Sequence, residues 1–448
     1  MIQSLTEALR SHGDREAIIF HGQTTSYRSL LTAVEQWRAR LDEHGVRAGQ
    51  VVALESAYSP QACAALVALI EAGAIIVPLV TLPDAKRAEF HEIAEVETVI
   101  ALDGTDAGLS ITATGRSASH ELFAALRREE RPGLVLFSSG TTGRSKASVL
   151  DFTKVLARYQ GGRSARTLSF LNLDHIGGIN TLLHTLVHGG AVVTVAERTP
   201  DSVFAAIEAH RVEVLPTTPT FLTMALVSGA VRRHDASSLR LVSYGTEPMP
   251  EQTLRAFHDA LPDVRLKQTY GLSELGILPT KSKDDSSLWV KLGSGSGFDY
   301  KIVDDVLWVR SEMAMLGYLN APAPFDEEGY FNTQDVVVCE GEYLKILGRR
   351  SEIINVGGEK VYPAEVENAV LEVDNIADVT VSGRRNAVTG MIVQATVKLV
   401  RPEDEETVAA RVQEHCAARL EAYKVPLVVR VSEAEQHSDR FKKTRSAA

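Results

Sequence analysis

Residues 51–78 read VVALESAYSPQACAALVALIEAGAIIVP, and this stretch decides the fold. Val51 to Glu55 is an apolar run typical of a buried strand, and Pro60 to Glu71 predicts a helix with proline in its first turn. Ile75 to Pro78 predicts a second buried strand. Because strands that alternate with helices of this length form parallel sheets covered on both faces, the stretch predicts a βαβ unit.

The same rhythm returns further along the chain. Strand-like and helix-like segments alternate there, over residues 191–196, 201–210, 212–215 and 219–227. Ligands of such sheets bind beyond the carboxyl ends of the strands. We therefore expect an α/β protein whose large N-terminal domain, residues 1–348, has mixed and parallel sheets with flanking helices.

The pattern changes after Gly348. Two strand-like runs, residues 379–383 and 392–400, precede a charged helix-like segment at 402–422 and a strand at 425–431. About one hundred residues of this kind fall within the usual size of a domain. We expect a small α+β C-terminal domain over residues 349–448.

Composition excludes several classes of protein. The 448 residues are 44% hydrophobic and 23% charged, as in ordinary globular proteins. The net charge of -11 argues against nucleic acid as a partner, because nucleic-acid-binding proteins present basic surfaces. The apolar run at 62–80 contains Glu71, Gly73 and Pro78, so we interpret it as a buried helix and strand and expect no membrane contact. Three separated cysteines and an N-terminus without a long apolar run favour the cytoplasm.

A loop rich in glycine and hydroxyl residues follows the strand-like run at 134–137. It reads SSGTTGRSK over residues 138–146. Glycines let backbone N–H groups turn toward an anion, hydroxyls add donors and Lys146 supplies charge, so the loop fits a polyphosphate. The spacing differs from a Walker loop. By composition alone, a plain surface turn remains equally open.

The order of this string resembles the phosphate loop of the adenylate-forming superfamily, which includes acyl-CoA synthetases, luciferases and peptide-synthetase adenylation domains. Further blocks match that family in the same order, from about residue 15 to residue 445. The resemblance implies that ATP, Mg²⁺ and coenzyme A are used to activate a carboxylic acid and transfer it to a thiol. In this loop it implies a catalytic role for Thr141 and nucleotide contacts for Ser138, Ser139, Gly140, Thr142, Gly143 and Lys146.

The block YGLSE at 270–274 resembles the family's YGxTE block. The resemblance implies that Tyr270 packs on adenine, that Gly271 and Ser273 belong to the same nucleotide site, and that Glu274 is catalytic and holds the magnesium ion. A hard cation bound to phosphates needs such a carboxylate. A turn with a capping glutamate is the alternative.

Two further blocks extend the expected nucleotide site. YGTEP at 244–248 resembles the loop that lines adenine and the acyl pocket. Asp335 stands where the family has an aspartate that accepts from both ribose hydroxyls, although Gln334 replaces the usual glycine before it. The residues that the first block adds to the site are Gly245, Thr246, Glu247 and Pro248.

The hinge between the two domains shows a departure from the family. GRRSE at 348–352 resembles the hinge block, in which Arg349 reaches the ribose or phosphate, but Ser351 replaces the usual charged pivot. The resemblance implies that the C-terminal domain is mobile about residues 350–351. Gly357 and Gly358 are then expected to line the pantetheine tunnel after rotation, although an ordinary β-turn is the alternative.

The C-terminal block SDRFKKTR at 438–445 stands where the family has its catalytic lysine. Alignment of Ser438 and Arg445 places Lys442 at that position. Phe441 replaces a glycine, and Lys443 is close enough to leave the assignment open. A lysine there would bridge the substrate carboxylate and the α-phosphate.

The acyl pocket is the least determined part of the site. SFLNLDHIGG at 169–178 is similar to the acyl- and aryl-CoA ligase pattern, so His175 is expected to line the pocket and take part in catalysis. A buried, hydrogen-bonded histidine is the alternative, and Asp174 could instead meet a substrate amino group. His184 and His188 have helical spacing, but without a third ligand they favour packing over zinc.

Substrate and acceptor remain open at this stage. Short, fatty, aryl and amino acids all fit the sequence. The acceptor could be the phosphopantetheine of an acyl carrier protein instead of coenzyme A, and a non-catalytic nucleotide-binding module is a third possibility.

Overall fold

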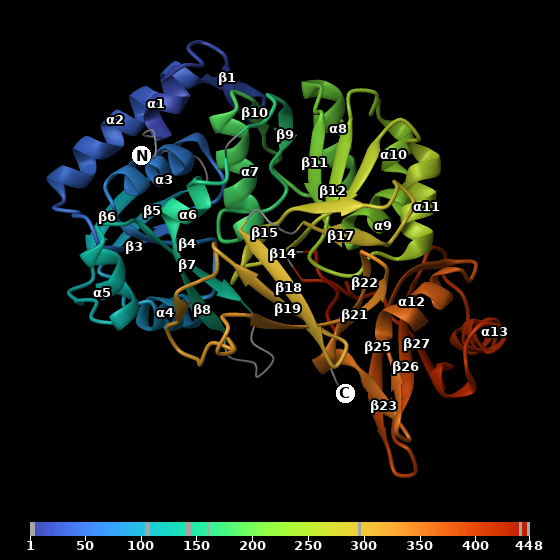
Figure 1. The fold of residues 1–448 in the computed structure, drawn as a ribbon. Coiled ribbons are helices and arrows are strands. Elements are labelled where there is room, and N and C mark those ends of the chain that lie inside the picture. Colours follow the sequence, from blue (N-terminus) through green and yellow to red (C-terminus); the bar gives the residue numbers. More distant parts are fainter. Residues whose placement is uncertain are drawn as a thin grey trace.

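The computed structural model describes residues 5–103, 108–138, 145–159, 161–293, 297–438 and 441–445. Its α/β architecture confirms the expected fold: two large sheets with flanking helices lie beside a smaller α+β unit formed by the end of the chain (Figure 1). The boundary at Gly348 and the mobility of the smaller unit stay predictions.

The first seven-stranded sheet contains the predicted βαβ unit. β3 and β4 pair in parallel, with Val51 opposite Ile75, and Ser59 caps α3 by accepting from the N–H of Ala62. Its strand order is β20-β8-β7-β4-β3-β5-β6. The bounds are β20 (Gly317–Tyr318), β8 (Lys146–Asp151), β7 (Gly133–Ser138), β4 (Ile75–Leu79), β3 (Val51–Glu55), β5 (Thr98–Leu102), β6 (Leu109–Ala113) and α3 (Pro60–Glu71).

The second seven-stranded sheet follows the second βαβ stretch of the sequence. Its order is β13-β12-β11-β9-β10-β1-β2, and every pair except β1–β2 is parallel. The bounds are β13 (Arg265–Gln268), β12 (Leu241–Tyr244), β11 (Val214–Thr217), β9 (Arg166–Leu168), β10 (Ala191–Val193), β1 (Glu16–Phe20) and β2 (Gln23–Ser26).

Helices cover the two sheets. The remaining helices of this part of the chain are α1 (Leu5–Arg10), α2 (Tyr27–Glu43), α4 (Asp84–Ile93), α5 (Glu121–Arg128), α6 (Phe152–Leu156), α7 (Ile176–Val187), α8 (Pro200–His210), α9 (Pro219–Ser228), α10 (Ala230–Arg233) and α11 (Glu251–Ala260). One face of the second sheet packs with α8, α9 and α11 in a core that includes Leu215, Val242 and Leu266. The helix α7 packs its apolar side into the other main core, with α3.

A largely antiparallel third sheet lies in front of both. Its order is β16-β17-β22-β21-β19-β18, and a short hairpin, β14–β15, stands beside it (Figure 1). The bounds are β14 (Tyr270–Leu272), β15 (Gly276–Leu278), β16 (Thr280–Ser282), β17 (Val290–Leu292), β18 (Phe298–Val303), β19 (Val306–Ser311), β21 (Phe331–Glu340) and β22 (Tyr343–Arg349).

The end of the chain forms a sheet of its own, with its own apolar core. The strands are β23 (Ile354–Val356), β24 (Glu359–Val361), β25 (Ile376–Asn386), β26 (Gly390–Leu399) and β27 (Val428–Val431), and the helices are α12 (Pro363–Leu371) and α13 (Glu405–Ala417). The helix predicted over 402–422 is shorter at both ends, because Asp404 caps its start by accepting from the N–H of Thr407. The strand predicted over 425–431 begins only at Val428.

Candidate active site

Glu274 lies in the turn between β14 and β15 and is 8% exposed. The hydroxyl of Tyr318 donates to its Oε1 at 2.8 Å, and the hydroxyl of Ser138, at the carboxyl end of β7, donates to the same oxygen at 3.4 Å. Among the described residues, no hydrogen bond reaches Oε2 of Glu274. A buried carboxylate with one oxygen held and the other unengaged suits a hard cation.

Lys146 and Ser138 flank the predicted phosphate loop. The ammonium of Lys146 lies 5.2 Å from the ring centroid of Tyr318, the tyrosine whose hydroxyl donates to Glu274. Asn320 accepts from the N–H of Ala147 at 3.1 Å and donates to the carbonyl of Ser145 at 2.8 Å, which fixes the end of the loop. The loop residues predicted to contact phosphate, Ser139, Gly140, Thr141, Thr142 and Gly143, lie outside the described residues.

Tyr318 and Asn320 were not predicted from the sequence. Both belong to the short GYLN segment at 317–320, which forms β20 and the residues after it. The pairing of β20 with β8, with Tyr318 opposite Ser148, brings them beside the phosphate loop. In the sequence, the pair Gly317-Tyr318 after an apolar run does not indicate a functional residue. Its role depends on the pairing of β20 with β8, which the sequence does not show.

Asp335 forms the second polar centre. The hydroxyl of Tyr270 donates to its Oδ2 at 2.6 Å, and Nε of Arg349 lies 3.5 Å from its Oδ1. Burial raises the pKa of Asp335, and the charge of Arg349 opposes that rise. Gln334 has a φ of 63°, which explains why glycine suits this position and why a side chain there carries strain. Thus Tyr270, Asp335 and Arg349, predicted from separate blocks, meet in space.

The loop after β12 approaches the same edge of the sheet. A Cβ on Gly245 would lie 2.5 Å from the carbonyl oxygen of Thr269, so only glycine fits there. Thr246 has a φ of 77°, and Pro248 is half-buried. Glu247 accepts from the N–H of Thr220 at 2.8 Å and from the N–H of Lys443 at 3.1 Å. Glu247 therefore joins helix α9 to the C-terminal segment.

The C-terminal segment separates the two candidate lysines. The Lys443 side chain is 6% exposed, and its ammonium donates to the carbonyl of Val379 at 2.7 Å and lies 3.4 Å from Asp378. Lys443 is thus anchored inside the smaller unit. The charge of Lys442, in contrast, acts on Asp335 and lowers that carboxyl's pKa against the effect of burial. Because the ammonium of Lys443 is engaged inside the smaller unit, Lys442 stays the predicted active-site lysine.

Phe441 explains how the segment is held. Its ring centroid lies 5.0 Å from that of Phe170 and 5.9 Å from that of Phe221, both in the core of the second sheet, and 5.3 Å from that of His437. The guanidinium of Arg198 lies 5.4 Å from the same ring. Phe441 has a φ of 53°, the conformation in which glycine costs least. Aromatic packing therefore offsets a strained backbone.

His175 caps α7. Its Nδ1 accepts from the N–H of Gly177 at 3.0 Å, and the residue is half-buried. A Cβ on Gly178 would lie 1.9 Å from the carbonyl oxygen of Asn172, so the chain before the helix packs tightly against it. The hydrogen-bonded alternative describes what the structure shows, and a contact between His175 and the substrate stays a prediction.

The predicted hinge directly follows Arg349 and so adjoins the Asp335 centre, whereas the glycine loop lies apart from both polar centres. Arg350 to Glu352 form a single 3₁₀ turn between β22 and β23. Gly357 and Gly358, with φ of 62° and 98°, form the turn between β23 and β24. Figure 1 places β23 at the far end of the smaller unit, away from β14 and β15. These glycines reach the site only if the smaller unit rotates.

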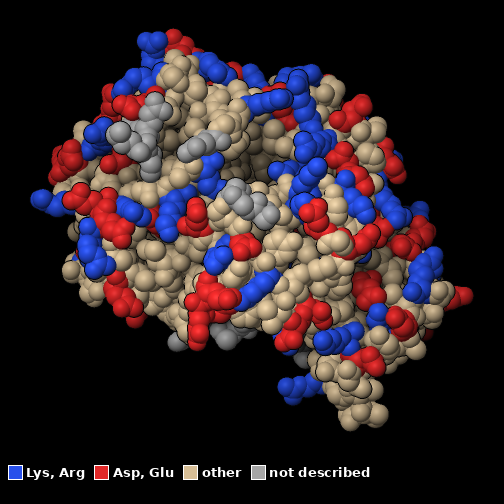
Figure 2. Space-filling model, in the orientation of Figure 1, with Lys and Arg blue, Asp and Glu red and all other residues tan. Residues whose placement is uncertain are grey.

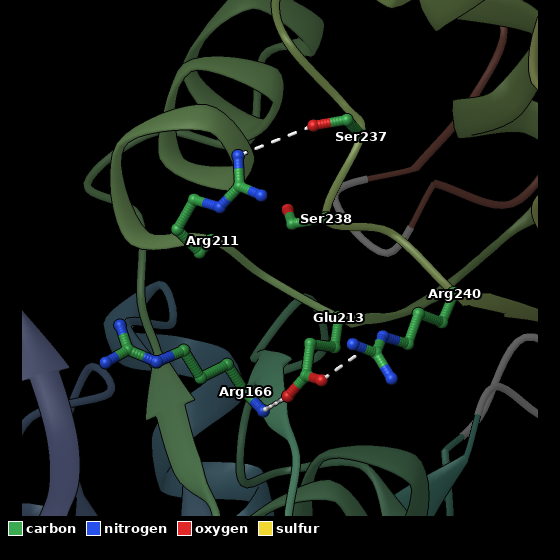
Figure 3. Close-up of a pocket in the computed structure, with 6 residues that line it drawn as sticks. All are labelled: Arg166, Arg211, Glu213, Ser237, Ser238 and Arg240. Atoms are coloured by element: carbon green, nitrogen blue, oxygen red, sulfur yellow. Dashed lines mark hydrogen bonds and ion pairs between the residues drawn. The ribbon is translucent and has the colours of Figure 1, made fainter.

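A pocket of about 260 Å³ lies at the opposite edge of the second sheet. Figure 3 shows its lining residues, which surround the amino ends of β9, β11 and β12: Arg166, Arg211, Glu213, Ser237, Ser238 and Arg240. Glu213 accepts from the N–H of Arg166 at 3.0 Å and lies 3.5 Å from Nε of Arg240. Because ligands of parallel sheets bind at the carboxyl ends, this pocket is not the candidate active site.

Within the described residues, no group of three or more histidine, cysteine, aspartate or glutamate side chains is arranged to hold a metal ion. The single carboxylate of Glu274 is instead the kind of ligand that magnesium uses when phosphates supply the rest. No helix in the described part of the chain is long and apolar enough to cross a membrane.

Comparison with known proteins places this geometry in a family. The chain belongs to the AMP-binding enzyme family, which it matches over residues 5–319, and the C-terminal domain of AMP-binding enzymes matches residues 365–447. Indoleacetate–CoA ligase of Aromatoleum aromaticum is 28% identical over 94% of this chain and 93% of its own. 2-Succinylbenzoate–CoA ligase of Enterococcus faecalis is 25% identical, with the same two coverages.

Solved structures show the same fold. An anthranilate CoA ligase in complex with anthranoyl-AMP superposes with a TM-score of 0.84 at 20% identity, covering 99% of this chain and 96% of its own. ATP-bound MatB from Rhodopseudomonas palustris gives a TM-score of 0.79 at 22% identity, covering 98% and 97%. At these identities the similarity establishes the fold.

Proposed function

We propose that the chain is an AMP-forming acid–CoA ligase, which activates a carboxylic acid with ATP and passes the acyl group to coenzyme A. The observation that carries the proposal is the pair of buried carboxylates, Glu274 and Asp335, that Arg349 links: its guanidinium lies 3.5 Å from Asp335, and both carboxylates act on its pKa. The relatives named above are acid–CoA ligases, which supports the same activity here.

In the first half-reaction a carboxylate oxygen of the acid attacks the α-phosphorus of ATP. A new P–O bond forms, the bond to the β-phosphate oxygen breaks, and pyrophosphate leaves with its electron pair. Two anions approach one another in this step, so positive charge and positioning are what the protein must supply. Lys442 and Lys146 supply charge, while Asp335 and Tyr270 hold the nucleoside.

Glu274 fits a magnesium ion, which would neutralise phosphate charge when bound. The hydroxyls of Tyr318 and Ser138 both donate to Oε1 of Glu274 and so fix the orientation of the carboxylate. Oε2 is the oxygen that we propose for the ion. The residues from Ser139 to Gly143 are proposed to contact the phosphates, as the family's loop does. Arg349, close to Asp335, is proposed to contact the ribose or a phosphate.

The second half-reaction requires the acyl-adenylate to meet a thiol. The thiol loses its proton to water, its sulfur attacks the acyl carbon, the bond from that carbon to the phosphate oxygen breaks, and AMP leaves with the electron pair. We propose that the smaller unit, residues 349–448, rotates about Arg350 and Ser351 so that Gly357 and Gly358 replace Lys442 beside the adenylate. A few hinge residues suffice for such a motion. The cytoplasm, where coenzyme A and ATP occur together, is the proposed location.

The test is pyrophosphate release from MgATP with a panel of short, fatty, aryl and amino acids, each with and without coenzyme A. Acid-dependent release that produces an acyl-CoA thioester is the expected result. Thioester formation only on a phosphopantetheinylated carrier protein would replace coenzyme A as the acceptor. Absence of release with every acid, in a preparation that still binds ATP, would overturn the ligase assignment.

A further inference from the structure

The second sheet has one packed face and one open face. Along β11, β12 and β13, Leu215, Val242 and Leu266 are buried in the core with α8, α9 and α11. The residues that alternate with them point to the other face, and they are half-buried or exposed on the inner strands β11 and β12 as well as on the edge strand β13: Val214, Pro216, Leu241, Ser243, Arg265 and Lys267. That face therefore borders a recess.

Helix α7 forms the opposite wall of the recess. Gly177 and Asn180 are half-buried and His184 is exposed, although most of the helix between them is buried. Figure 2 shows a hollow between α7 and the strands β9, β11 and β12, with lysine and arginine side chains on its rim. His184 is exposed on this helix, and desolvation lowers its pKa, together with the charges of His188 and Lys267.

The far end of this recess collects two cations and a histidine. Lys267 extends from β13, His184 from α7, and Arg158 from the turn after α6, where its guanidinium lies 4.8 Å from the ring centroid of Phe298. The ring of Tyr159 lies 6.0 Å from that of His184, which places this turn against α7. Among the described residues, neither Lys267 nor Arg158 has an ion pair with a carboxylate, and His184, whose lowered pKa favours the neutral imidazole, adds a ring N–H donor.

Such an arrangement costs free energy in the empty protein. Desolvation lowers the pKa of Lys267, and the charges of Arg265 and Arg158 lower it further. Desolvation also lowers the pKa of Arg158. Elsewhere this chain pairs half-buried cations, as Lys301 with Asp326 at 2.7 Å. Partly desolvated cations without a carboxylate partner are typical of an anion-binding site, because a bound anion would offset their desolvation and mutual repulsion.

The recess leads toward the candidate active site. β13 continues directly into Tyr270, three residues beyond Lys267, or about 10 Å along extended chain. His175, at the start of α7, stands nine residues before His184, or roughly 13 Å along a helix. Along the chain, Lys267 and His184 thus lie about 10–13 Å from Tyr270, expected at the adenine, and from His175, expected in the acyl pocket.

We infer that the acid activated by this chain carries a second anionic group, a carboxylate, at the end remote from the carboxyl that reacts. The inference rests on the proposed function and names its substrate class. Lys267, Arg158 and His184 bind the distal carboxylate, and a rigid aryl or extended chain spans the roughly 10 Å between the two acid groups. Lys267 is a specificity-determining residue that takes no part in the chemical step.

Matched pairs of acids test the inference with the full-length protein. Pyrophosphate release is measured with suberate beside octanoate and with 4-carboxycinnamate beside cinnamate. A charged hydrogen bond predicts that kcat/KM for the dicarboxylate exceeds that of its partner by about 10- to 100-fold. Equal or better turnover of the monocarboxylates would overturn the inference and leave the ligase assignment intact, whereas no release with any acid would remove both.

Variants locate the effect. Lys267→Met should lower kcat/KM for the dicarboxylates by about tenfold or more, mainly through KM, and leave the monocarboxylates within about twofold. Lys267→Glu should shift preference toward 8-aminooctanoate. Arg240→Gln, at the pocket of Figure 3, is the control and should change neither ratio. Because it removes a desolvated like charge, Lys267→Met should melt at the same temperature as the parent or higher. An equal loss for both acids, or a rise in KM for coenzyme A instead, would overturn the assignment.

Discussion

The backbone N–H of Lys443 donates to Oε2 of Glu247 at 3.1 Å, and this bond joins the end of the chain to the loop after β12. Glu247 also accepts from the N–H of Thr220, so one carboxylate ties the start of α9 to the C-terminal segment. Burial raises the pKa of Glu247, and these two bonds oppose that rise. The position of Lys442 therefore depends on the hydrogen bond between the backbone N–H of Lys443, the next residue, and Glu247.

Lys442→Ala and Lys443→Ala should fail in different ways. Lys442→Ala removes a charge that faces the site, so adenylation should fall about 10²- to 10³-fold while the folding stability stays close to that of the parent. Lys443→Ala removes the ammonium beside Asp378 and one of the two cations beside the buried Glu367, where Arg445 remains, and should cost about 3–5 kcal/mol of stability. Pyrophosphate release and thermal melting separate the two. Normal adenylation by Lys442→Ala would remove that residue from the mechanism.

The two half-reactions should also respond differently to Lys442→Ala. If the smaller unit rotates, Lys442 is remote from the adenylate when the thiol attacks. Thioester formation from a preformed acyl-adenylate should then proceed within a few-fold of the parent rate. Equal losses in both steps would contradict the rotation.

Phe441→Gly should weaken the arrangement in which Lys442 faces the site. The change relieves a φ of 53°, worth about 1–3 kcal/mol, but it removes ring contacts with Phe170 and Phe221 and the burial of a phenyl group. We expect the lost contacts to exceed the relief, so adenylation should slow by about 5- to 30-fold and thioester formation from the adenylate should not. Phe441→Leu keeps an apolar side chain and should show a smaller loss; faster adenylation by Phe441→Gly would mean that strain dominates.

The sequence predicted the α/β fold because periodicity is local. The run from Val51 to Pro78 forms the expected strand, helix and strand, and β3 and β4 pair in parallel as required. The ends of elements were less predictable, because capping residues decide them. The predicted helix began at residue 402, but Asp404 caps α13, which begins at Glu405.

The candidate site also contains residues that the sequence could predict and residues that it could not. Tyr270, Glu274, Asp335 and Arg349 stand in blocks with a recognisable order, so the sequence could predict them, and the structure brings them together. Tyr318 and the anchoring of Lys443 could not be predicted, since each depends on contacts between segments far apart in the chain. The polar groups of the recess were missed for the same reason: Arg158, His184 and Lys267 are separated by dozens of residues and carry no motif.

Tyr318→Phe should weaken the hold on Glu274. The change removes the hydroxyl that donates to Oε1 at 2.8 Å and leaves the ring under Lys146 in place. Loss of one hydrogen bond to a buried charge costs about 1.5–3 kcal/mol, so adenylation should fall by about 10- to 100-fold. Titration of activity against Mg²⁺ should also need a higher concentration for half-saturation. An unchanged magnesium dependence would argue against Glu274 as the ligand, and Tyr330→Phe, at the Asp299 surface contact, serves as the matched control.

Glu367 should make the C-terminal segment sensitive to acid. Burial alone would raise the pKa of this carboxyl, but Lys443 and Arg445 hold it below its ordinary value. A lowered folded-state pKa gives stability that is present above the unfolded pKa of about 4.3 and is lost as the pH falls through the folded one. The parent should therefore lose stability steeply below about pH 4.3, while Glu367→Gln, which breaks the buried pairs with Lys443 and Arg445, should be about 3–5 kcal/mol less stable at pH 7 and flatter in acid.

Urea unfolding at a series of pH values measures that difference. The control is Glu365→Gln on the same helix, which loses a 2.8 Å contact with Lys424 but is 40% exposed, so it should cost less than about 1 kcal/mol and keep the parent's pH slope. The steep acid limb belongs to Glu367 only if it disappears in Glu367→Gln and persists in Glu365→Gln. If both variants keep the limb, other carboxylates carry the acid sensitivity, and the ion pairs of Lys443 and Arg445 with Glu367 are not what holds the segment at neutral pH.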